Sequence, residues 1–137
     1  MTNLFVYGTL MCEDIMQEVA GCCLSHEPGT LRGYSRRAVK GEHYPALVPH
    51  ESGRADGLVY REVPPSAWER LDRFEGEMYR RQEVQVELDD GRLLPAATYV
   101  ARAEFLAQLE LYDWDFAGFL RRGKKLFQEE YREPLSE

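Results

Sequence analysis

Short apolar runs separated by glycine, proline or polar residues dominate the first hundred positions of this chain, and they predict strands. Four runs have the length and the flanking residues of strands: 4–7, 29–39, 44–48 and 57–60. Polar and apolar residues then alternate over 82–88, and the turn signal Asp89-Asp90-Gly91 leads into an apolar run over 93–101. This arrangement predicts a β-hairpin.

Helical spacing of apolar residues predicts the remaining elements. It is present over 11–20, directly after the first strand. A second helix is expected to begin at Pro64-Pro65, which suits a first turn, and to end before Gly76, which suits a C-terminal cap. The tail over 103–131 has the same spacing with a break in the middle, so it predicts two helical pieces.

Length and connectivity favour one α+β domain. At 137 residues the chain is long enough to bury a core without disulfides or metals, and it contains neither an internal repeat nor a low-complexity linker. Strands outnumber helices and their connections are mostly too short for parallel crossovers, so the sheet is expected to be largely antiparallel or mixed. We expect a single domain over 1–137, with a mainly helical C-terminal segment over 103–137.

The charge balance makes nucleic acids and anionic membranes unexpected partners. The net charge is −7, from 24 acidic and 17 basic residues, so long-range attraction to phosphates is weak. The basic cluster over 121–125 lies in a predicted helix, where a solvated face is the simpler interpretation. No stretch approaches the ~18 apolar residues that a transmembrane helix needs. Nothing in the pattern indicates an oligomeric state.

The cysteines favour a reducing, cytoplasmic location. Cys12, Cys22 and Cys23 cannot all pair with one another, and the adjacent Cys22 and Cys23 are poor bridge partners. They also lack the C-x-x-C step, and the three histidines lack paired ligand spacing, so the sequence predicts no metal site.

The segment Tyr7-Gly8-Thr9-Leu10 is the first candidate site. A strand that ends in glycine before a helix directs successive backbone N–H groups at one point, and the helix N-terminus adds a positive dipole end, so a carboxylate or phosphate is the expected ligand. Thr9 can add a hydroxyl donor. The segment has neither of the glycine patterns that bind nucleotides. The alternative interpretation is an ordinary structural turn.

The second candidate is Glu75, which lies between Phe74 and Gly76 at the end of a predicted helix. A carboxylate that faces a pocket there has its pKa raised by desolvation and is able to transfer protons near neutral pH. The alternative is a solvated glutamate beside a cap glycine.

Cys12 is the runner-up, as a nucleophile near the expected start of a helix, where a thiolate is stabilised. A cysteine hydrolase also requires His26, His43 or His50 nearby, and no spacing in the sequence indicates such an approach. A structural thiol is the simpler interpretation.

Five strings, taken together, resemble the γ-glutamylcyclotransferase-like superfamily, with the greatest similarity to its branch of γ-glutamylamine cyclotransferases and plant avirulence-induced proteins. The resemblance spans about residues 3–120 and rests on the order and spacing of 5–10, 44–46, 57–60, 71–80 and 97–100.

The resemblance implies a small mixed β-barrel flanked by helices and a cofactor-independent enzyme of the acyl-transfer or lyase type. It implies a pocket formed by Tyr7, Gly8, Thr9 and Leu10, with Glu75 as the catalytic glutamate and Tyr99 as an aromatic pocket residue. The usual reaction of the family is intramolecular: the α-amine of a small γ-glutamyl substrate attacks the γ-carbonyl, which releases an amine and 5-oxoproline.

Two other functions remain alternatives at this point. One is a non-catalytic protein that binds a small carboxylate metabolite or a peptide end in the same pocket. The other is the Cys12-dependent hydrolase.

Overall fold

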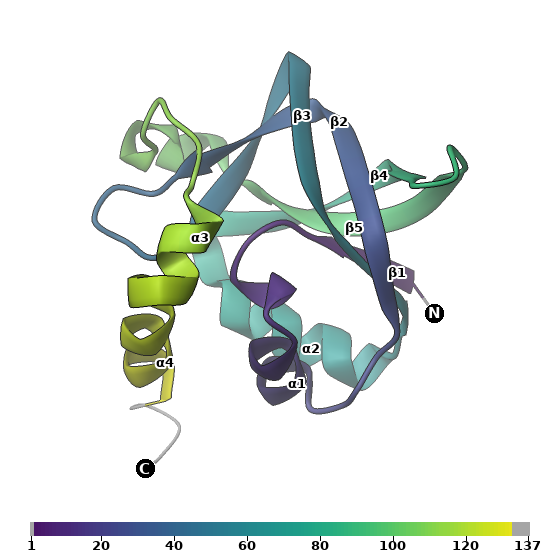
Figure 1. Ribbon diagram of the computed structural model, residues 1–137, viewed down its shortest axis with the longest axis horizontal. Coiled ribbons are helices and arrows are strands. Elements are labelled where there is room, and N and C mark those ends of the chain that lie inside the picture. The colour runs from purple at the N-terminus through teal and green to yellow at the C-terminus, as the bar shows by residue number, and fades with distance from the viewer. Residues whose placement is uncertain (1, 133–137) are drawn as a thin grey trace.

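Five strands close into a barrel in the order β1-β3-β2-β4-β5 (Figure 1). The structure is a computed structural model that describes residues 2–132, with side chains through residue 129. The strands are β1 (Thr2–Val6), β2 (His26–Ala38), β3 (Pro45–Val63), β4 (Tyr79–Leu88) and β5 (Leu93–Ala101). All their pairings are antiparallel except that of β1 with β5, where Leu4 lies opposite Ala97. The predicted mixed, largely antiparallel barrel is therefore confirmed.

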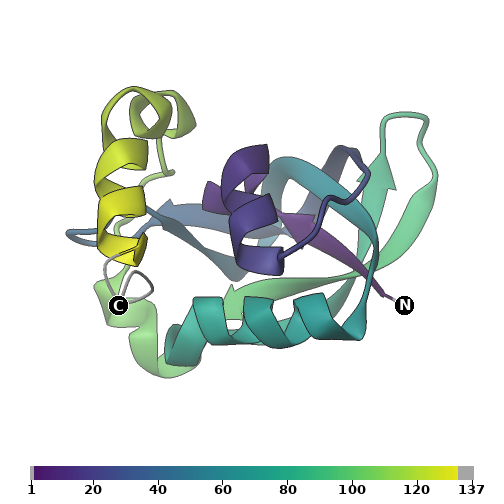
Figure 2. The ribbon, with the colours of Figure 1, turned by 90° about the horizontal axis from the view of Figure 1, so that it is seen from below.

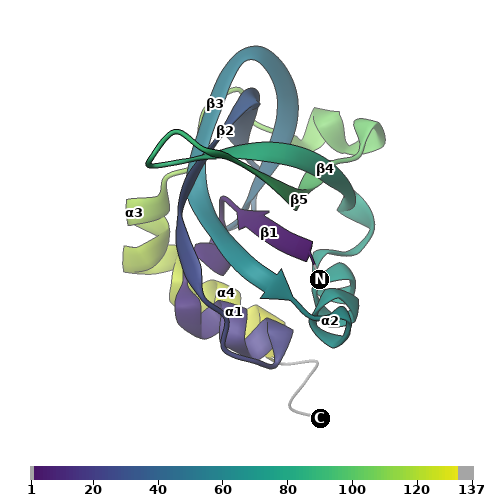
Figure 3. The ribbon, with the colours of Figure 1, turned by 90° about the vertical axis from the view of Figure 1, so that its right-hand side faces the viewer.

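The helices gather on one side of the barrel (Figures 1 and 3). They are α1 (Glu13–Ala20), α2 (Pro65–Glu75), α3 (Phe116–Gly118) and α4 (Lys124–Arg132), the last two joined by a π-helical turn over Phe119–Gly123. Short 3₁₀ turns occupy Thr9–Met11, Gly76–Met78 and Ala103–Gln108. Among the described residues, none of these helices has the length and apolarity needed to cross a bilayer.

Most elements lie where the pattern predicts them, and the hairpin over 82–101 is confirmed by the β4–β5 pairing. The two strands expected over 44–48 and 57–60 are wrong as separate elements, because both belong to the 19-residue strand β3. The polar stretch between them is largely exposed, so it carries no hydrophobic alternation, yet its backbone pairs with β2.

The helix expected over 11–20 begins only at Glu13, because the 3₁₀ turn precedes it. The C-terminal segment is helical over most of its described part, and residues 133–137 of that prediction lie outside the described residues.

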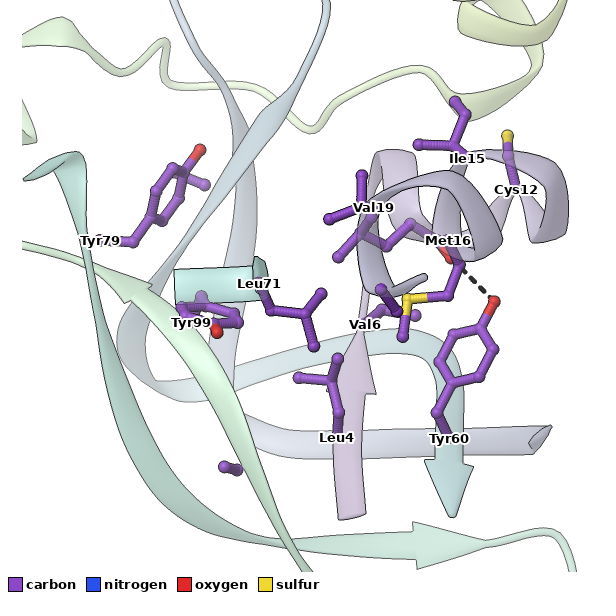
Figure 4. Packing of buried hydrophobic residues seen from close by; sticks show 14 of the residues in the cluster. Leu4, Val6, Cys12, Ile15, Met16, Val19, Tyr60, Leu71, Tyr79 and Tyr99 are labelled. Carbon is purple, nitrogen blue, oxygen red and sulfur yellow. Dashed lines mark hydrogen bonds between the residues drawn. The ribbon is translucent and has the colours of Figure 1, made fainter. Parts of the chain in front are cut away.

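Strand β1 is buried on both faces from Leu4 to Val6, which explains the unbroken apolar sequence of this part. Leu4 and Val6 pack with α1 and α2, as Figure 4 shows, whereas Phe5 and Tyr7 belong to a second core made of strand residues. The hydroxyl of Thr98 on β5 donates to the Phe5 carbonyl at 2.9 Å and reinforces barrel closure. The chain that leaves β1 is thus held between two packed layers.

Candidate active site

A cavity of about 280 Å³ lies where the chain leaves β1. Its walls include all six residues that were predicted from the sequence: Tyr7, Gly8, Thr9, Leu10, Glu75 and Tyr99. They come from the segment that follows β1, from the end of α2 and from β5. The fold therefore brings together segments that are separated by more than sixty positions in the chain.

The Gly8–Leu10 loop presents backbone donors. Met11 N donates to Gly8 O at 2.9 Å and Cys12 N to Thr9 O at 3.1 Å, which closes the 3₁₀ turn. Within residues 2–132, the N–H groups of Gly8, Thr9 and Leu10 have no hydrogen-bond partner in the protein. The expectation that a helix begins directly after this loop and adds its dipole is wrong. The 3₁₀ turn comes first, and α1 begins only at Glu13. The N–H groups available to an anion therefore lie at the start of the 3₁₀ turn and not at the N-terminus of α1.

Glycine at position 8 is required by close packing. A Cβ there would lie 2.6 Å from Cγ and 2.7 Å from Cδ of Pro45, inside van der Waals contact. Tyr79 holds Pro45 in place, because its hydroxyl donates to the Pro45 carbonyl at 2.7 Å. The Gly8 backbone therefore packs directly against Pro45, whose position is fixed by the Tyr79 hydrogen bond.

We expect small carboxylates such as citrate or formate to bind at the N–H groups of Gly8, Thr9 and Leu10. Backbone amide shifts in a ¹⁵N-labelled sample titrated with citrate check this, with the largest changes at these three residues. Shifts confined to the surface cluster over 121–125 would contradict it.

Glu75 continues the buried stripe of α2. The helix buries Ala67, Trp68 and Leu71, and Glu75 lies one turn beyond Leu71 on the same face. The helix then ends at Gly76, whose φ of 73° is left-handed and whose N–H donates to Asp72 O. This early end leaves Glu75 at the cavity wall.

Burial and, as the smaller cause, the nearby Asp72 carboxylate together raise the pKa of the Glu75 carboxyl from 4.5 to about 8. The residue keeps partial exposure because the cavity is open to solvent. Among the described residues, the Glu75 carboxylate has no hydrogen-bond or ion-pair partner. It is a carboxyl group poised to gain or lose a proton near neutral pH.

The tyrosines of the cavity act as rigid walls. The Tyr7 hydroxyl donates to Tyr99 O at 2.7 Å, and the Tyr99 hydroxyl donates to Asp72 Oδ1 at 2.6 Å. Burial raises the pKa of the phenols of Tyr7, Tyr79 and Tyr99 above the usual value. These phenols are therefore neutral at physiological pH, and none of them is a base.

Several cavity residues were not predicted as site residues from the sequence: Phe5, Val6, Tyr44, Pro45, Phe74, Met78, Tyr79 and Phe127. All of them except Phe127 lie within the strings of the family resemblance, which is the one signal that pointed to them. Phe127 comes from the last helix, outside those strings. It is buried, and it also forms part of the cavity wall.

Cys12 does not have the environment of a nucleophile. It is buried, and desolvation raises the pKa of its thiol. The side chains of His26 and His50 bind Glu13 and Ser35, and the backbone of His43 accepts from Trp114. In the described part of the chain, no group of three or more His, Cys, Asp or Glu side chains is placed to hold a metal ion.

The fold and the site are those of a small mixed β-barrel protein whose cavity is lined by the Gly8–Leu10 loop and by the half-buried Glu75. Residues 4–116 match the family described as "Gamma-glutamyl cyclotransferase, AIG2-like". AIG2-like protein D of Arabidopsis thaliana is 34% identical over 100% of this chain and 95% of its own length. AIG2-like protein C of the same plant is 31% identical over 91% of this chain and 73% of its own length.

Solved structures agree with these sequence matches. The solution structure of an Arabidopsis thaliana protein superposes with a TM-score of 0.73 at 28% identity, covering 98% of this chain and 81% of the other. A mouse AIG2-like protein gives 0.63 at 26% identity, over 84% and 88%. A γ-glutamyl cyclotransferase gives 0.66 at 16% identity, over 80% and 68%, which supports the fold alone. The chain belongs to the AIG2-like family of γ-glutamyl cyclotransferases.

Proposed function

We propose that this protein is a γ-glutamyl cyclotransferase that converts a γ-glutamyl amine or amide to 5-oxoproline and the free amine. The observation that carries the proposal is the Glu75 carboxyl, unpaired among the described residues and with a pKa raised to about 8, in the same cavity as the free N–H groups of Gly8, Thr9 and Leu10. The family membership supports the same reaction class.

The substrate supplies its own nucleophile in this mechanism. Ionised Glu75 accepts a proton from the α-ammonium group, and the resulting α-amine attacks the γ-carbonyl carbon to form the ring C–N bond. Glu75 then returns the proton to the departing nitrogen as its C–N bond breaks. The ring nitrogen gives up its second proton to the released amine, which leaves as an ammonium ion. One carboxyl therefore serves as base and then as acid.

The other walls hold the reacting atoms. The N–H groups of the Gly8–Leu10 loop are donors for the anionic oxygens of the substrate, and donors fixed in advance stabilise developing charge without reorganisation. The tyrosine walls, tied to backbone carbonyls, keep the cavity in one shape. Holding amine and carbonyl in a folded conformer supplies much of the rate by proximity.

A screen for 5-oxoproline release from γ-glutamyl amines, dipeptides and isopeptides tests the proposal. The wild-type protein is expected to release 5-oxoproline and amine in equal amounts from at least one substrate. The Glu75→Gln variant is expected to release far less 5-oxoproline from the same substrate. Binding of a γ-glutamyl compound without release from any of them would instead favour the non-catalytic carboxylate-binding protein.

Cys12→Ser is expected to retain at least half of the wild-type kcat, because the cyclisation has no covalent enzyme intermediate and the thiol is buried. The measurement is kcat for 5-oxoproline release, with circular dichroism to verify folding. A folded Cys12→Ser protein without activity would make the cysteine hydrolase the leading hypothesis.

A further inference from the structure

We infer that Arg36 on β2 is a positioning residue for the Gly8–Leu10 loop: its guanidinium fixes the Tyr7–Gly8 peptide and strengthens the Gly8 N–H as a donor to a substrate carboxylate. The reaction as described does not use Arg36, which is not among the described residues that line the cavity. The inference deepens the proposed function, because it names a side chain that prepares the binding loop without touching the substrate.

The guanidinium of Arg36 is held in one orientation. Its Nη1 donates to the Tyr7 carbonyl at 2.9 Å, and its Nε and Nη2 donate to the two carboxylate oxygens of Asp113 at 2.8 and 3.2 Å. Only 17% of the Arg36 side chain is exposed, and its guanidinium lies 5.5 Å from the Trp114 ring centroid. A planar fork of donors suits this combination of a carboxylate, a carbonyl and an aromatic ring better than a lysine ammonium does.

The partners of Arg36 are themselves held against β2. The chain that leads into α3 passes along the end of β2 (Figures 1 and 2), where Ala38 N donates to Tyr112 O at 3.1 Å. The backbone N–H of Trp114 donates to Asp113 Oδ1 at 2.7 Å, and the indole N–H of Trp114 donates to His43 O at 3.1 Å. The Asp113 carboxylate and the Trp114 ring therefore meet Arg36 from a fixed segment.

The Tyr7 carbonyl and the Gly8 N–H belong to the same peptide unit. In a planar trans peptide these two groups point in opposite directions, so fixing the carbonyl toward Arg36 fixes the Gly8 N–H away from it. Gly8 lines the cavity, and its N–H has no hydrogen-bond partner within residues 2–132. A charged donor on the carbonyl also polarises the peptide, which makes this N–H a stronger donor.

Citrate affinity, measured by calorimetry, tests the inference without any turnover. Arg36→Met is expected to weaken citrate binding by about tenfold or more, because the charge-assisted bond to the Tyr7 carbonyl is lost. An unchanged affinity in the folded Met variant would overturn the inference. If that variant does not fold, Arg36→Gln also removes the charge and is expected to lose about threefold or more; an unchanged affinity there would overturn the inference equally.

Two further variants separate positioning from simple attraction between charges. Arg37→Met removes the same charge one residue along, on the opposite face of the strand, where the Arg37 side chain has no hydrogen-bond or ion-pair partner among the described residues. Its citrate affinity is expected to stay within about twofold of wild type, and a loss equal to that of Arg36→Met would overturn the inference. Arg36→Lys keeps a charged donor and is expected to bind citrate more tightly than Arg36→Met. Wild-type affinity in the Lys variant also supports the inference, because one charged donor on the Tyr7 carbonyl is then sufficient.

Asp113→Asn tests the other partner of the guanidinium. The Asp113 side chain is 64% exposed, so its ion pair contributes little and the loss of citrate affinity is expected to be about threefold or less. A greater loss in Asp113→Asn than in Arg36→Met would overturn the assignment to Arg36.

The amide signal of Gly8 in the ¹⁵N-labelled protein without ligand reports on the peptide directly. Among the three loop residues, Gly8 is expected to show the largest shift change in Arg36→Met, because its N–H shares the peptide whose carbonyl loses the charged donor. A Gly8 signal that does not move would contradict the inference.

Kinetics distinguish failure of the inference from failure of the proposed function. Arg36→Met is expected to raise KM for 5-oxoproline release by about tenfold and to leave kcat within about threefold, because Glu75 is unchanged. A fall in kcat with an unchanged KM would contradict the positioning role. If the wild-type protein releases no 5-oxoproline from any substrate, the proposed function fails and the citrate comparison still decides the inference. If wild type does not bind citrate at the loop, the inference fails whatever the turnover.

Discussion

Glu75→Gln is expected to lower kcat for 5-oxoproline release by about 10² to 10⁴, because the amide keeps the size of the side chain but cannot accept a proton. Binding of a γ-glutamyl compound is expected to remain, since the Gly8–Leu10 donors are unchanged. The matched control is Glu77→Gln, two residues away and exposed, which is expected to leave kcat within about twofold. A larger loss in Glu77→Gln than in Glu75→Gln would contradict the assignment.

The pH dependence of the free energy of unfolding of Glu75→Gln shows whether its loss of activity comes from the missing proton transfer or from unfolding. The pKa of Glu75 is higher in the folded protein, so the folded state binds the proton more tightly and the free energy of unfolding falls as pH rises from 4.5 to about 8. Glu75→Gln removes this penalty and is expected to be more stable than wild type at pH 9 by at least about 1 kcal/mol, given about 1.4 kcal/mol per pKa unit. Below pH 4.5 this difference disappears.

Gly57→Ala is expected to lower the free energy of unfolding by about 3 kcal/mol, the upper end of the usual cost of overpacking. A Cβ at this position would lie 2.0 Å from the Val6 carbonyl oxygen, which is backbone and cannot rotate away. Strands β1 and β3 would have to separate where Val6 pairs with Leu58, next to the start of the cavity loop. Urea denaturation measures the loss, and activity is expected to fall with it.

Gly33→Ala is the matched control for this second prediction. Gly33 lies on β2 with a φ of 87°, and a Cβ there meets no atom within 4 Å. Its cost is the left-handed backbone alone, about 1 kcal/mol. If Gly57→Ala costs no more than Gly33→Ala, the close approach of β1 and β3 is not as the structure shows it.

The sequence was informative where a local pattern determines the structure. The apolar run that breaks at Gly8 marks the end of β1, and the Pro65 start and Gly76 end of α2 set the position of Glu75. In each case a residue with special backbone properties lies within a few positions of the site residue. Local rules of capping and turn formation are sufficient there.

The features that the sequence did not predict depend on contacts between residues far apart in the chain. Strand β3 is continuous because β2 pairs with its polar middle, and no local periodicity records that pairing. Phe127 reaches the cavity only because α4 packs against Tyr44 and Phe74, which are more than fifty residues away in sequence. The bond from the Tyr99 hydroxyl to Asp72 likewise depends on how β5 lies against α2.

The most direct test of the account is the titration of Glu75 itself. Carbon-13 chemical shifts of the glutamate side-chain carboxyls, compared between wild type and Glu75→Gln, identify its signal. We predict a titration midpoint near pH 8 for that signal, and a kcat/KM for 5-oxoproline release that rises with pH through the same midpoint as the carboxylate ionises. A midpoint near 4.5, with activity independent of pH above 6, would contradict the proton-transfer role assigned to Glu75.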